Sequence, residues 1–94
     1  MLLERAEILI KEGTEQEFAA AMRERGLPIL KAVPGVKSVA LGRGVENPGK
    51  FMLLVEWESM EAHDAFRNST VNGPFRKLFA PYSKGGSMEH FEIG

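Results

Sequence analysis

Four segments of the chain have the pattern of apolar residues expected of β-strands, whose successive side chains point to opposite faces. In the first of these segments, Ala6, Ile8 and Ile10 fall on one face. A turn signal, Glu46-Asn47-Pro48-Gly49, separates the second segment from the third and predicts a hairpin. The pattern therefore predicts strands at residues 2–10, 36–45, 50–57 and 88–93.

Between the first two strands the spacing of apolar residues is helical. Thr14 and Glu17 match a capping box, in which the hydroxyl and the carboxylate each satisfy a free backbone N–H at the start of a helix. Gly26 and Pro28 weaken the pattern further along. Because proline lacks an N–H donor and clashes with the preceding turn, a kink or break is expected at Pro28.

A second helical region follows the third strand and is interrupted once. Ser59 is the expected cap of a helix at about 60–68, and Asn72-Gly73-Pro74 restarts a helix with proline in its first turn. Pro81 ends this second piece. Lys84-Gly85-Gly86-Ser87 predicts a flexible link to the last strand.

The order of elements predicts an α+β fold of the ferredoxin-like kind, β-α-β-β-α-β, with an antiparallel sheet and helices on one face. At 94 residues, the chain is long enough for one domain, residues 1–94. The third strand is apolar on both faces, with Met52 and Leu54 opposite Phe51, Leu53, Val55 and Trp57. A second copy related by a two-fold axis would cover the outer face. A monomer with a few exposed apolar side chains is the alternative.

Composition removes several classes of partner. Twelve Lys and Arg against 13 Asp and Glu give a net charge of −1, so no basic excess is available to neutralise nucleic-acid phosphates. No apolar run approaches the roughly 20 residues that span a membrane, and the first residues do not match a signal peptide. With no cysteine, disulfides and thiolate chemistry are excluded, and the cytoplasm is the expected location.

His63 is the strongest candidate for chemistry, because imidazole exchanges a proton near neutral pH and His63 lies one helical turn before Phe66. A structural hydrogen-bonding role is the alternative. Trp57 is either a core anchor or part of a pocket. The same choice applies to the remaining aromatic candidates, Phe66, Phe75, Phe79, Tyr82 and Phe91.

Other charged and polar residues predict no further site. The two histidines are 27 positions apart, 63 and 90, and no cysteine accompanies them, which argues against a zinc site. Gly42-Arg43-Gly44 is too short to cradle a phosphate. The charges expected on strands, Arg5, Glu7, Arg43 and Glu56, are interpreted as opposite-sign pairs across a dimer interface. No role is predicted for His90.

Several segments together resemble the antibiotic biosynthesis monooxygenase family. The strand-ending tryptophan and the helix histidine that follows it carry most of this likeness. The matching segments are Ile10–Gly13, Val33–Val36, Leu53–Ser59, Glu61–His63, Phe66–Ser69, the phenylalanines of the last helix and Glu89–Glu92. The resemblance implies a dimeric α+β barrel. A haem-degrading branch is disfavoured, because the first strand has no asparagine and residues 60–80 have no tryptophan.

Some members of that family oxygenate phenols, anthrones or quinols with dioxygen and without metal or flavin. The resemblance therefore implies a cofactor-independent monooxygenase acting on an aromatic, polyketide-like or quinol substrate, with His63 as the base and no cofactor. A homodimer that binds a small apolar ligand without turning it over is the alternative, and a purely structural dimer is a weaker one.

Overall fold

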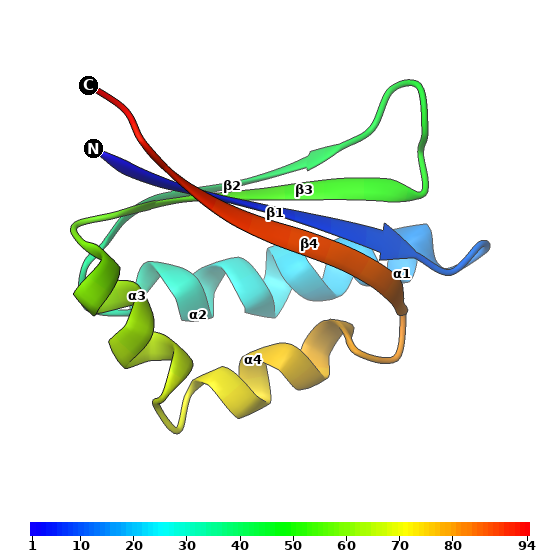
Figure 1. Cartoon of the computed structure of the whole chain (residues 1–94). Helices are drawn as coiled ribbons and strands as arrows, with labels where there is room; N and C mark the ends of the chain where they lie inside the picture. The colour runs from blue at the N-terminus through cyan, green and yellow to red at the C-terminus, as the bar shows by residue number, and fades with distance from the viewer.

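Four antiparallel strands form one sheet in the order β2-β3-β1-β4, and the helices pack on one face of it (Figure 1). The structure is a computed structural model that describes residues 1–94. The strands are β1 (Leu2–Ile10), β2 (Val36–Arg43), β3 (Lys50–Trp57) and β4 (Ser83–Glu92). The helices are α1 (Glu15–Ala21), a π-helical segment η1 (Met22–Gly26), α2 (Leu27–Lys31), α3 (Met60–Arg67) and α4 (Asn72–Phe79). This confirms the predicted α+β, ferredoxin-like β-α-β-β-α-β fold.

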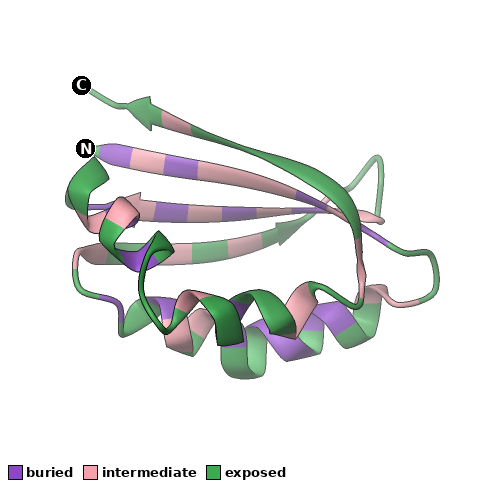
Figure 2. Cartoon of the chain, turned by 60° about the horizontal axis from the view of Figure 1, so that its bottom comes forward, coloured by how far each residue is buried: buried purple, intermediate pink, exposed green.

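The core lies between the sheet and the helices, where the buried segments of both layers meet (Figure 2). Alternate residues of β3 enter it, and Phe51, Val55 and Trp57 are almost completely buried. Phe18 on α1 meets Phe51 edge to face, with ring centroids 4.8 Å apart. No helix is both long and apolar enough to cross a membrane.

The first helix differs from the prediction at both ends. Thr14 precedes α1, but its hydroxyl donates to the carbonyl of Lys11 at 2.7 Å and forms no cap, so the predicted capping box is wrong. The chain stays helical through Pro28, so no break occurs there. A turn of wider π-helix, Met22–Gly26, interrupts the α-helical hydrogen-bonding register just before it.

The segment expected to be a flexible link is instead part of a long edge strand. β4 begins at Ser83 and pairs with β1 as far as the register Leu2↔Glu92, with an irregularity between Leu9 and Ile10. Glycine allows the two backbones to approach here, since a Cβ on Gly86 would lie 2.2 Å from the carbonyl oxygen of Glu7. Sequence reasoning treated these glycines as breakers, whereas pairing with β1 makes them strand residues.

The strand charges find partners within one chain. Arg5 donates to Glu89 at 2.6 Å, and Lys50 lies 3.4 Å from Glu7. Arg43 donates to the carbonyl of Pro48 and stacks over Phe51. Contacts within one chain therefore account for Arg5, Glu7 and Arg43, and pairing of these charges across a dimer interface stays a prediction.

Candidate active site

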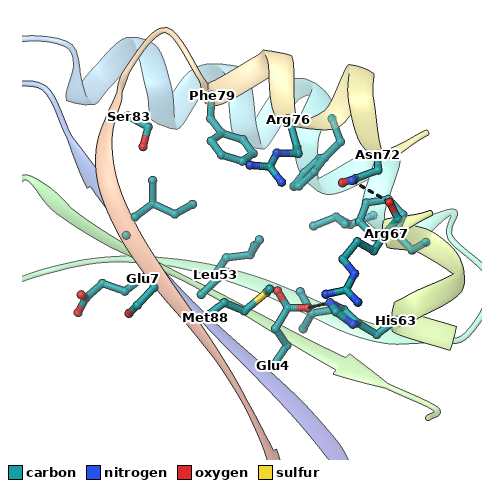
Figure 3. Close-up of a pocket in the computed structure, with 18 of the residues that line it drawn as sticks. Glu4, Glu7, Leu53, His63, Arg67, Asn72, Arg76, Phe79, Ser83 and Met88 are labelled. Carbon is teal, nitrogen blue, oxygen red and sulfur yellow. Dashed lines mark hydrogen bonds and ion pairs between the residues drawn. The ribbon is translucent and has the colours of Figure 1, made fainter. Parts of the chain in front are cut away.

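A cavity of about 420 Å³ lies between the sheet and helices α3 and α4 (Figure 3). Much of its wall is apolar. Glu4 and His63 lie at one end, and Arg67, Asn72 and Arg76 also line it (Figure 3). The residues that line it include Leu53, Val55, Trp57, Phe66, Phe75, Phe79 and Met88. A volume above roughly 300 Å³ is sufficient for a small organic ligand.

Glu4 enters the cavity from the core face of β1. Strand alternation places it on the same side as Leu2, Ala6 and Ile8, and the residue is only 7% exposed. Its carboxylate Oε1 accepts a hydrogen bond of 2.8 Å from the indole Nε1 of Trp57. The tryptophan therefore has two roles, because its ring packs in the core while its N–H fixes the carboxylate.

His63 reaches the same point from α3. Ser59 begins this helix as predicted, its Oγ accepting a hydrogen bond from the backbone N–H of Ala62. His63 is only 4% exposed, and its Nε2 lies 3.7 Å from Oε1 of Glu4. Its Nδ1 lies 3.4 Å from Oδ1 of Asp64, so each ring nitrogen has a carboxylate oxygen nearby. Nε2 is the nitrogen on the side of Glu4, which lines the cavity.

His90 completes a cluster that the sequence did not predict. The β1–β4 register places it opposite Glu4, with its Nε2 at 3.8 Å from Oε1. The His63 and His90 rings meet edge to face at 4.3 Å. Burial, and then the neighbouring His63, holds the pKa of His90 below the ordinary value of 6.5, although Glu4 opposes this shift. The Nε2 of His90 is buried without a hydrogen-bond partner.

This cluster is also the group of side chains that could hold a metal ion. One atom from each of Glu4, His63 and His90 lies within 4.8 Å of the others, although the sequence spacing argued against such a set. Without a metal, a carboxylate and two imidazoles at this separation can accept a proton and share it. The arrangement suits removal of a proton from a ligand hydroxyl placed in the apolar cavity.

The predicted aromatic residues divide into two sets. Trp57, Phe66, Phe75 and Phe79 line the cavity together with His63. Phe91 does not, because β4 alternation places it opposite Leu3 on the outer face of the sheet, where it is 42% exposed. Tyr82 packs against the edge of the core instead. The inclusion of Phe91 among the pocket residues was therefore wrong.

Sequence reasoning missed Glu4 and His90 for different reasons. Glu4 carried a usable signal, since it is a carboxylate in phase with the apolar face Ala6, Ile8 and Ile10. His90 carried none, because its contact with His63 depends on the pairing of β4 with β1. Strand pairing brings residues together irrespective of their separation in sequence.

The fold and the cavity define a class of small ferredoxin-like domains with a ligand site between the sheet and the second helical region. The model of the antibiotic biosynthesis monooxygenase family matches residues 1–79. YczJ, an uncharacterized protein of Bacillus subtilis strain 168, is 37% identical over 94 residues that cover 98% of both chains. The chain therefore belongs to the antibiotic biosynthesis monooxygenase family.

Solved structures agree with this assignment. A Bordetella bronchiseptica protein assigned to the same family superimposes with a TM-score of 0.91 at 29% identity, covering 99% of this chain and 96% of that one. SnoaB, a cofactor-independent oxygenase from Streptomyces nogalater, gives a TM-score of 0.85 at 14% identity, covering 98% of this chain and 91% of that one. At that identity the likeness to SnoaB shows the fold alone.

Proposed function

We propose that this protein is a cofactor-independent monooxygenase that uses dioxygen to oxidise an aromatic, polyketide-like or quinol substrate. One observation carries the proposal: His63, with its Nε2 beside the buried carboxylate of Glu4, lines a cavity that aromatic side chains also line. Family membership supports the same reading, as does the description of SnoaB as an oxygenase of this fold.

In the proposed reaction, His63 accepts the proton of a substrate phenol or enol. The resulting electron-rich anion passes an electron to dioxygen, and the two radicals combine at the activated carbon to form a peroxide. For an anthrone, loss of water then leaves a ketone, so the reacting CH₂ carbon loses two hydrogens and gains one oxygen atom while the other oxygen leaves as water. Glu4 stabilises the protonated imidazole, and the apolar walls exclude water from the anion.

In the proposed reaction, the unpaired Nε2 of His90 contacts the substrate. Buried polar atoms in proteins are nearly always hydrogen-bonded, and Nε2 of His90 has no partner within the chain. In the proposed complex a substrate oxygen at the polar end of the cavity lies between His63 and His90. His90 then orients the substrate, while His63 takes the proton.

The test is oxygen uptake with 1,8-dihydroxyanthrone and with 1,4-dihydroxynaphthalene, corrected for oxidation in buffer alone. Replacing His63 with alanine should lower turnover by about 10²–10⁴-fold while the protein stays folded, the range for losing a positioned acid–base group. If His63→Ala lowers the melting temperature but leaves turnover per folded molecule unchanged, His63 is structural and the mechanism is wrong.

The alternative is a protein that binds a small apolar ligand without chemistry, which the mainly apolar walls also favour. Calorimetric binding of the same aromatics with no oxygen uptake, in the wild type, would identify this function.

We further propose that two copies associate through the outer face of the sheet. Leu3, Met52 and Leu54 are only partly buried there, and Phe91 is exposed beside them. Strand alternation turns these residues away from the helices, so nothing in the chain itself covers them. A second sheet packed face to face would remove this apolar surface from water.

A further inference from the structure

We propose that the cavity takes an aromatic ligand bearing an anionic group, such as a hydroxyarene carboxylate, and that Arg76 binds that group. The inference rests on the proposed function in one respect, that the ring hydroxyl of the ligand faces His63. It extends that function by naming the substrate class and the residue that selects it.

Most of the charges that line the cavity have partners within the chain. Glu7 is paired with Lys50 at 3.4 Å, and Glu4 lies among His63, His90 and the indole of Trp57. Arg67 lies 3.6 Å from Asp64. The lining residues carry one further charge, on Arg76, and its guanidinium has no ion pair or hydrogen bond within the chain.

The Arg76 side chain points into the cavity (Figure 3), where a ligand could pair with its charge. Arg76 lies on α4, and Figure 3 shows its guanidinium turned into the cavity beside the ring of Phe79. Glu4 and His63 lie across the cavity from it (Figure 3). A planar ligand resting against Phe75 and Phe79 would therefore have a proton acceptor at one end and a cation at the other.

Arginine suits this task better than a generic cation would. Its planar fork of N–H groups pairs with both oxygens of a carboxylate, which adds geometric selectivity to the attraction of charges. The polar cluster around Glu4 would repel the same anion, so the ligand is expected to enter with its neutral hydroxyl toward His63. The two ends of the cavity thus fix the orientation of the ligand as well as its charge.

The test compares 6-hydroxy-2-naphthoate, whose hydroxyl and carboxylate lie at opposite ends of the ring system, with its uncharged methyl ester by isothermal titration calorimetry. Charge-assisted hydrogen bonds to Arg76 should make the acid bind about tenfold or more tightly than the ester. In Arg76→Gln the ratio of the dissociation constants of ester and acid should fall close to one. Lys77→Gln is the matched control, because it removes the same charge from an exposed position on the same helix that does not line the cavity.

Three outcomes would overturn the inference: no preference for the acid in the wild type, a preference retained in Arg76→Gln, or an equal loss in Lys77→Gln. Thermal melting of both variants shows whether each is folded. Neither ligand needs to be oxidised, so the binding result is separate from the oxygen-uptake result. Uptake without the acid preference overturns this inference alone, whereas the preference without uptake overturns only the proposed catalysis.

Discussion

Replacing Glu4 with glutamine is the most informative single change at the site, because it removes a charge while preserving shape and an acceptor oxygen. In the wild type, Oε1 of Glu4 lies 3.7 Å from Nε2 of His63. At an effective dielectric constant near 20, a full charge at that distance stabilises an imidazolium by about 4 kcal/mol. If His63 becomes protonated during turnover, the loss corresponds to roughly a 10²–10³-fold slower reaction.

Stability should change much less than turnover in Glu4→Gln. The amide oxygen can still accept the 2.8 Å hydrogen bond from Trp57, now without charge assistance, a difference of about 1 kcal/mol. For a domain of this size that corresponds to a melting temperature lower by about 4–8 °C. Glu17→Gln, at an exposed position on α1, controls for the change in net charge. Oxygen uptake in Glu4→Gln equal to that of the wild type would refute the electrostatic role of Glu4.

Three further changes probe the interface, the sheet and the histidine cluster. Leu54→Lys would place an unpaired cation in the proposed dimer interface. Light scattering should then report a mass of 10.4 kDa instead of twice that mass. A monomeric wild-type protein would rule out the dimer. Gly86→Ala should lower stability by about 1–3 kcal/mol through its clash with the carbonyl of Glu7, whereas Gly73→Ala meets no neighbour and should not. Because the pKa of His90 is lowered in the native state, the unfolded state binds more protons below about pH 6.5, and stability should fall as the pH decreases from there. Urea unfolding at pH 7.5 and 5.5 should show a smaller fall in His90→Gln, and an unchanged fall would contradict the assignment.

Local patterns were sufficient for most of the elements. β1 and β3 have the predicted bounds, and the cap formed by Ser59 is present. These features depend on neighbouring residues, through strand alternation or a side chain that reaches a backbone N–H three positions away. The second strand stops at Arg43, two residues early, because Gly44 already belongs to the hairpin turn.

For β4 and for the polar cluster, a partner distant in sequence decided the structure. Gly85 and Gly86 have the composition of a loop, but they are strand residues because they pair with Leu9 and Ile8 of β1. The same β1–β4 register places His90 opposite Glu4. A pattern read along one strand does not contain the register between two strands, so the place of His90 in the cluster was beyond prediction.

Packing alone does not account for Glu4. The position faces the core between Leu2 and Ala6, where an apolar side chain would be the simple solution. Replacing buried charged groups by well-packed apolar ones is often neutral or stabilising by about 1–4 kcal/mol, so the carboxylate is a poor choice for stability. Yet the chain surrounds it with an indole N–H and two imidazoles at one end of the cavity. The carboxylate satisfies the buried indole N–H of Trp57, and the proposed chemistry in the cavity gives a second reason for a charged group at this position.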